Sequence, residues 1–357
     1  MVAKSPHEAR SERLGTLLSL VLLGLLSSLL VPLPARQITL EVLGSPLAIN
    51  FSGAVQLIVV LGALVCAGID LALRTHPHLA TRSIWYTSTF WPLPVLVATG
   101  GLAATHAVNS RGWQVLLTAA TGVALVEVAL AQYRTVGGQA SSRRAMLWLK
   151  ISVYLLAVAL LIALFGARLR SLLSASGVLL LCTGLSLELY RHAEERAGRI
   201  WLYALLTGLV MGELTWGLNY TRFSGRAGGA LLLLAFYLLS GLVQQHLWAR
   251  LTRRVILEYA AVGLAGLALL AFLWWWCGLH LKNTARYFTL LAYAILPTMA
   301  WGQNIGRPDH QSLILLLLTV AIGLEVNLIT TPDRRPVQIA GGMAWGLALW
   351  TSLFEPL

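Results

Sequence analysis

Residues 66–85 read CAGIDLALRTHPHLATRSIW, and residues 182–201 read CTGLSLELYRHAEERAGRIW. Each stretch begins as an apolar helix, passes through a short polar turn and becomes apolar again. Aligned without gaps at an offset of 116 residues, the two stretches match at cysteine, glycine, histidine, isoleucine and tryptophan positions as well as at leucines. A helix, a tight polar connection and a second helix, occurring twice, predict an all-α protein built by internal duplication.

The composition places these helices in a membrane. The chain has 357 residues, of which 57% are hydrophobic and only 11% charged, whereas soluble domains carry about 25% charged residues. A membrane-spanning helix needs about 20 mostly apolar residues. We predict a polytopic helical membrane protein with about twelve transmembrane helices, at residues 14–33, 53–74, 88–108, 113–133, 146–167, 171–190, 200–219, 228–249, 255–279, 287–305, 311–330 and 336–353.

The offset of 116 residues extends beyond the quoted motif. It also carries Arg134 onto Arg250, at the ends of the fourth and eighth predicted spans. A unit of four helices keeps the same orientation in each copy, so the repeat is parallel. We predict a single membrane domain, 1–357, composed of repeat unit 1 (1–140), repeat unit 2 (141–254) and a more weakly marked unit 3 (255–357).

One connection differs from the others. Residues 37–51 alternate apolar and polar side chains on both sides of a Gly44-Ser45-Pro46 turn, a pattern that predicts a β-hairpin. Repeat unit 2 has no counterpart for it. We predict that this hairpin lies on the extracytoplasmic side, as a cover for helix ends or as a lid.

The formal net charge of +12 does not indicate nucleic-acid binding, because the basic residues lie between apolar spans rather than on one face. More of them fall on the side of the N-terminus, which predicts that both termini are cytoplasmic in the plasma membrane. Cys66, Cys182 and Cys277 lie in or beside apolar spans without metal-ligand spacing. No motif for catalysis, a cofactor or a metal is present in the sequence, so we predict no catalytic residue, no cofactor and no metal site.

Three acids lie one turn or less from an arginine: Asp70 with Arg74, Glu188 with Arg191, and Glu258 with Arg254. Such neighbours share a helix face. They sit where both side chains reach water, so they are predicted to be interfacial ion pairs. Two prolines in TFWPLP (89–94) predict a kinked third span with freed carbonyl groups.

Acids deeper in the spans are the candidates for a functional site, because an intramembrane carboxylate is costly unless it is paired or hydrated. The alternative is that they hold helices together through hydrogen bonds. The predicted lining of a polar cavity consists of Glu213, Thr215, Asn219, Glu325, Asn327 and Glu127.

The leading functional prediction is a transporter or permease that contacts the lipid bilayer and moves a small solute or ion, with no nucleic-acid partner. The alternatives are a non-catalytic scaffold or accessory subunit of a membrane complex, and a membrane-embedded lipid-modifying enzyme. The sequence favours a non-enzymatic role and leaves the oligomeric state open.

Overall fold

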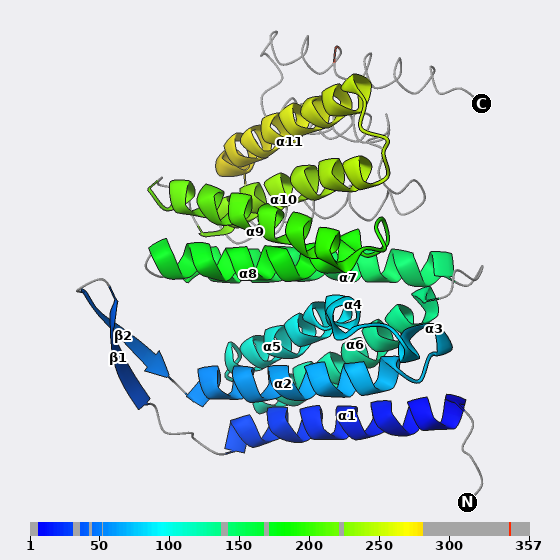
Figure 1. The fold of residues 1–357 in the computed structure, drawn as a ribbon. Helices are drawn as coiled ribbons and strands as arrows, with labels where there is room; N and C mark the ends of the chain where they lie inside the picture. The colour runs from blue at the N-terminus through cyan, green and yellow to red at the C-terminus, as the bar shows by residue number, and fades with distance from the viewer. Residues whose placement is uncertain are drawn as a thin grey trace, which may run out of the picture. The chain divides into compact units, whose positions relative to one another are not determined.

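The computed structural model describes residues 6–30, 36–42, 45–51, 53–136, 142–167, 171–220, 225–280 and 343. Within these ranges the chain is almost entirely helical (Figure 1). The longer helices are α1 (Pro6–Leu30), α2 (Gly53–Leu73), α5 (Pro92–His106), α6 (Arg111–Thr135), α7 (Ser142–Gly166), α8 (Ser171–Tyr190), α9 (Ala197–Asn219), α10 (Gly225–Leu247) and α11 (Arg253–His280).

Seven of these helices are long and apolar enough to cross a membrane, by length and composition: α1, α2, α6, α7, α8, α9 and α10. The described residues therefore support seven of the predicted spans, and the total of twelve stays a prediction. The predicted third span, 88–108, is shorter in the structure, because α5 has only 15 residues. The last three predicted spans lie outside the described residues.

The chain divides into two compact units. Unit 1 contains residues 1–156 and 183–205, and unit 2 contains residues 157–182 and 206–357. Consequently α7, α8 and α9 each contribute residues to both units.

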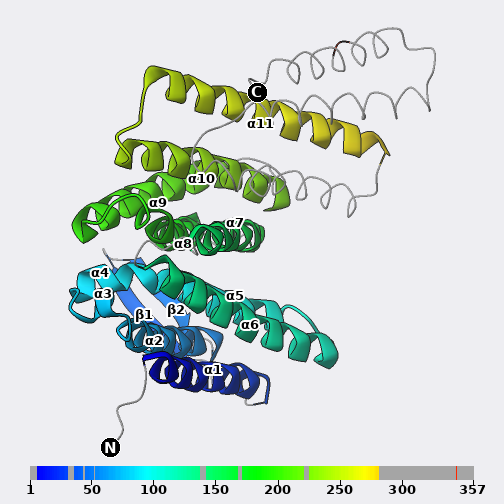
Figure 2. The same cartoon turned by 90° about the vertical axis from the view of Figure 1, so that its right-hand side faces the viewer.

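In unit 1, helices α1, α2, α5 and α6 pack against one another (Figures 1 and 2). Their shared interior is apolar and includes Val21, Leu25, Val65 and Leu93, none of which is more than 1% exposed. Close packing of aliphatic side chains and small residues is how helices associate within lipid. These four helices of unit 1 thus form a bundle whose shared interior is apolar.

In unit 2, helices α7 and α10 approach each other closely at glycines. A Cβ atom added to Gly229 would lie 2.8 Å from the Cα atom of Ile162, so only glycine fits there. Gly241 of α10 packs against the ring of Tyr259 on α11 in the same way.

Two short strands precede α2. Strand β1 (Arg36–Val42) pairs with β2 (Ser45–Phe51) in antiparallel fashion, with Leu40 opposite Leu47. These strands overlap the segment 37–51, whose alternation predicted a hairpin.

The connection between α2 and α5 is built from short helical pieces: α3 (Pro77–Ala80), α4 (Ile84–Thr87) and the 3₁₀ turn η1 (Ser88–Phe90). Helix α5 then begins at Pro92, which tolerates the first helical position because it needs no N–H partner there. We call residues 84–106 the discontinuous helix, because its regular hydrogen-bond pattern is interrupted at Trp91, although the backbone of Trp91 stays in the right-handed helical region.

A buried polar network in unit 1

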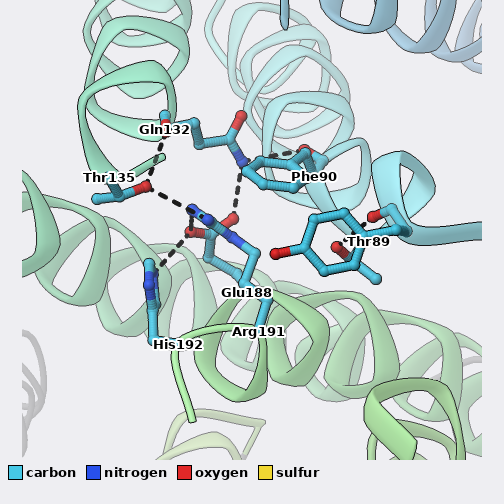
Figure 3. A network of polar contacts seen from close by, with 8 residues as sticks. Thr89, Phe90, Gln132, Thr135, Glu188, Arg191 and His192 are labelled. Atoms are coloured by element: carbon cyan, nitrogen blue, oxygen red, sulfur yellow. Dashed lines mark hydrogen bonds and ion pairs between the residues drawn. The ribbon is translucent and has the colours of Figure 1, made fainter. Parts of the chain in front are cut away.

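Glu188 is the centre of a buried polar network that we call the Glu188 network. Its members are the Phe90 carbonyl and ring, and the side chains of Gln132, Thr135, Glu188, Arg191 and His192 (Figure 3). All belong to unit 1. They come from the discontinuous helix, from the end of α6, and from the end of α8 with the two residues that follow it.

The core of this network is an ion pair. Arg191 Nη2 donates to Glu188 Oε1, and the two side chains are only 4% and 1% exposed. The guanidinium also lies 4.2 Å from the centroid of the Phe90 ring, a favourable cation–π position. Removing two charges from water costs several kcal/mol per ion, so the pair depends on its additional hydrogen bonds.

Gln132 links this ion pair to the discontinuous helix. Its Nε2 atom donates to Glu188 Oε2 at 2.7 Å and to the Phe90 carbonyl oxygen at 2.9 Å. In an intact α-helix the N–H of residue 94 would donate to that carbonyl, but residue 94 is a proline and has no N–H. The proline therefore frees the acceptor that Gln132 uses.

Thr135 closes the network on the other side. Its Oγ1 atom donates to the Gln132 carbonyl oxygen at 2.7 Å and accepts a hydrogen bond from Arg191 Nη1 at 3.3 Å. The last turn of α6 thus holds both partners of the ion pair, one through Gln132 and the other through Thr135.

Some hydrogen-bonding capacity remains unused. Gln132 Oε1 and Arg191 Nε are buried, and neither has a hydrogen-bond partner in the part of the chain that the structure describes. Buried unsatisfied groups cost about 1–3 kcal/mol each, and in native proteins water or a ligand usually satisfies them. The site can therefore accept a hydrogen bond at Gln132 and donate one at Arg191.

His192 lies beside the ion pair, with Nε2 3.5 Å from Glu188 Oε1. This separation is beyond a good hydrogen bond. Burial, reinforced by the positive charges of Arg191 and Lys150, lowers the pKa of His192 to about 4. The imidazole is consequently neutral at physiological pH.

This depressed pKa makes stability depend on pH. Because the unfolded histidine takes up a proton near pH 6.5 and the folded one only near pH 4, the free energy of unfolding falls as the pH drops through that window. We expect a loss of about 3 kcal/mol between pH 6.5 and pH 4, since one pKa unit corresponds to about 1.4 kcal/mol. Unfolding of the purified protein in detergent across this range measures it. His192→Asn should flatten the pH dependence, and an unchanged slope in that variant would assign the effect to other groups.

A double-mutant cycle tests whether Pro94 frees the Phe90 carbonyl for Gln132. Gln132→Leu should cost about 1–3 kcal/mol, because it leaves the Phe90 carbonyl and Glu188 with unmet hydrogen bonds. Pro94→Ala restores an N–H four residues after Phe90, so the cost of Gln132→Leu should be smaller in that background. Unfolding of the four proteins in mixed micelles gives the coupling. Additivity within about 0.5 kcal/mol would show that Gln132 and Pro94 act separately.

The structure corrects one sequence-based prediction about this region. The Glu188–Arg191 pair is buried rather than interfacial, because α6 and the discontinuous helix cover it. The Asp70–Arg74 pair is half-buried, with Arg74 Nη2 also donating to Thr87 Oγ1 at 3.3 Å. In the Glu258–Arg254 pair the arginine is exposed and the glutamate is half-buried.

The predicted cavity residues are not part of the Glu188 network. Glu127 on α6 and Glu213 on α9 are exposed. Thr215 is buried and donates to the Met211 carbonyl of its own helix at 2.7 Å. Asn219 Nδ2 donates to Ser174 Oγ at 2.7 Å within unit 2. Glu325 and Asn327 lie outside the described residues.

Gln132, Thr135 and His192 were not singled out from the sequence. The signal for Gln132 was available in principle, because the proline at 94 frees a carbonyl at 90 and an amide near a span end can reach it. Nothing in the sequence indicated that α6 and α8 would meet there. Among the described residues there is no group of three or more His, Cys, Asp or Glu side chains that could hold a metal ion.

Comparison with known proteins identifies a protein family. A family model described as "Protein of unknown function (DUF5656)" matches residues 33–274, which include every member of the Glu188 network. No curated protein and no solved structure matches the chain.

Proposed function

Because this chain belongs to the family described as "Protein of unknown function (DUF5656)", whose description assigns no activity, we propose a function from its own residues: transport of a small solute or ion across the membrane. The observation that carries the proposal is the Glu188 network. A buried ion pair adjoins a carbonyl freed in a discontinuous helix.

Two physical arguments support transport. Ionisable side chains buried among membrane helices are costly, and they commonly mark solute, ion or proton pathways. Transporters also form their binding sites at discontinuous helices, where unwound carbonyl groups face the solute. The Phe90 carbonyl shares one feature with such sites: it has no N–H donor at position 94 and accepts from Gln132 instead, although the backbone at Trp91 stays helical. The unused donor Arg191 Nε and acceptor Gln132 Oε1 are the groups that would bind the solute or ordered water.

A duplicated architecture is part of the proposal. Helix α2 begins at Gly53 and α8 at Ser171, while α6 begins at Arg111 and α10 at Gly225, close to the offset of the repeated motif. In addition, Trp201 Nε1 donates to the Trp85 carbonyl at 3.4 Å, so the tryptophans that end the two motif copies touch. These observations support a parallel repeat of units 1–140 and 141–254.

The proposed orientation follows the distribution of basic residues. Both termini face the cytoplasm of the plasma membrane, and the strands β1 and β2 lie on the extracytoplasmic side. The polar strip of Glu213, Thr215 and Asn219 on α9 is retained as the alternative location of the solute site, with Glu127, Glu325 and Asn327 as further candidates.

Transport is tested with the full chain in proteoliposomes, using potassium, chloride and glycerol as probes. We expect at least one probe to cross faster than in protein-free vesicles, and Glu188→Gln to abolish the increase. Glu258→Gln is the matched control, because Glu258 also pairs with an arginine on its own helix but is only half-buried, and its partner Arg254 is 86% exposed. Flux is expressed per monodisperse protein, so that loss of folding is not mistaken for loss of transport.

Two outcomes would count against the proposal. Equal permeation with and without protein for every probe would favour the scaffold alternative. If Glu188→Gln and Glu258→Gln reduced the probe flux equally, the buried ion pair would have no special role in transport.

A further inference from the structure

Side-chain contacts bring the ends of several helices of unit 1 together. Arg13 Nη1 donates to the Leu71 carbonyl at 2.5 Å, which places the start of α1 beside the end of α2. The centroids of the His76 and Tyr133 rings are 4.8 Å apart, so the end of α6 lies beside the end of α2 as well. Arg191, directly after α8, donates to Thr135. These four helix ends therefore form one end of unit 1.

This end is rich in exposed arginines. Helix α7 begins at Ser142, only seven residues after α6 ends at Thr135, so the chain keeps the first turn of α7 near this end. We call the following exposed side chains the arginine-rich end: Arg13, Arg82, Arg134, Arg143 and Arg144. Glu194 is engaged with Arg199 at 3.3 Å, and the exposed acids Glu12 and Glu195 do not balance the arginines.

Exposed apolar side chains lie next to these arginines. In α4, Ile84 is 57% and Trp85 is 70% exposed. Directly before them, the Arg82 guanidinium lies 5.1 Å from the centroid of the Tyr86 ring. Tryptophan beside arginine at the end of membrane helices is typical of the membrane–water interface, where the indole lies at headgroup depth.

We propose that the arginine-rich end of unit 1 binds the phosphate groups of anionic phospholipids. Guanidinium groups match phosphate in geometry and charge, and they bind it through paired hydrogen bonds. Each basic residue near an anionic membrane surface contributes about 1 kcal/mol of attraction. Because α1, α2 and α6 are candidate spans and each has one of its ends here, we place these arginines at the depth of the headgroups. This inference does not depend on transport.

Thermal unfolding of the full chain in neutral detergent tests the proposal. Phosphatidylglycerol is added in one arm, phosphatidylcholine in a second and inorganic phosphate in a third. We expect phosphatidylglycerol to raise the melting temperature by several degrees, and the other two additions to have little effect. The rise should be largely lost in 0.5 M NaCl, where exposed charges are screened within about 5 Å.

Variants locate the binding surface. The triple substitution Arg134→Gln, Arg143→Gln and Arg144→Gln should remove most of the rise caused by phosphatidylglycerol. Arg111→Gln is the matched control, because Arg111 is also exposed but begins α6, whereas Arg134 lies at the other end of that helix. It should respond like the unmodified protein.

Three results would overturn the proposal. Phosphatidylcholine could stabilise the protein as strongly as phosphatidylglycerol, which would indicate a general lipid effect. Inorganic phosphate could reproduce the rise, which would indicate a site for a soluble anion. The triple variant could respond as strongly as Arg111→Gln, which would place the lipid elsewhere. The salt dependence of the unmodified protein tests the charge argument even if the triple variant does not fold.

Discussion

Replacing Glu188 by alanine is expected to lower the free energy of unfolding by about 3–5 kcal/mol, because it leaves the buried guanidinium of Arg191 without its counter-charge. Both side chains are almost completely buried, so water cannot compensate. Gln132 Nε2 would lose one of its two acceptors as well. Unfolding in mixed micelles of detergent and dodecyl sulfate gives the free energy directly.

The exposed pair in α11 provides the control for this prediction. Glu258→Ala also breaks an acid–arginine contact one helical turn long, but the Arg254 side chain is 86% exposed. Exposed ion pairs contribute about 0–1 kcal/mol, so the expected effect is small. Similar losses in the two variants would contradict the burial argument. The double substitution Glu188→Leu with Arg191→Met should recover much of the loss, since an apolar pair of similar size carries no desolvation cost.

Replacing Gly229 by leucine is expected to destabilise unit 2 by more than the about 1–3 kcal/mol typical of overpacking. A Cβ atom at this position would lie 2.8 Å from the Cα atom of Ile162, and a backbone atom cannot move aside as a side-chain tip can. Helices α7 and α10 must therefore separate. The loss should be visible in the free energy of unfolding and in the melting temperature.

Gly217 on α9 is the matched control for Gly229. It is exposed, and a Cβ atom added there meets no atom within 4 Å. Gly217→Leu should be neutral or slightly stabilising, because glycine is about 1 kcal/mol less favourable than alanine inside a helix. If both glycines tolerated leucine equally, close packing of α7 on α10 would be wrong.

The helical membrane architecture was predictable because it depends on composition and on the length of apolar runs. The strands β1 and β2 overlap the segment 37–51, whose apolar and polar residues alternate. The number of spans was less predictable. The run at 88–108 is apolar throughout, yet Pro92 and the turn at Ser88–Phe90 shorten its regular helix to α5. Hydropathy alone does not register such a break.

The site was harder to predict than the fold. Glu188 looked like a surface acid because it lies two residues from the end of α8, with Arg191 as a local partner. Its burial results from contacts with Gln132, which is 56 residues away in the sequence. Conversely, Glu213 looked deep because it lies within an apolar run, yet its side chain is exposed. Depth along a helix and direction around it are separate quantities, and the sequence indicated only the first.

Pro94 shows what the sequence did contain. The prolines in TFWPLP were expected to free carbonyl groups, and the Phe90 carbonyl is free to accept the Gln132 amide. The sequence did not show that Gln132 would be the donor to this carbonyl, because that depends on how α6 packs beside the discontinuous helix.

Flux through proteoliposomes containing Glu188→Gln, compared with Glu213→Gln, tests the central claim most directly. Both substitutions neutralise one acid in a membrane helix; only Glu188 is buried in a polar network with Arg191 and Gln132. The buried network predicts that Glu188→Gln abolishes the flux of whichever probe the unmodified protein carries, while Glu213→Gln retains it. Loss of flux in Glu213→Gln together with full flux in Glu188→Gln would contradict the account and place the solute site on α9.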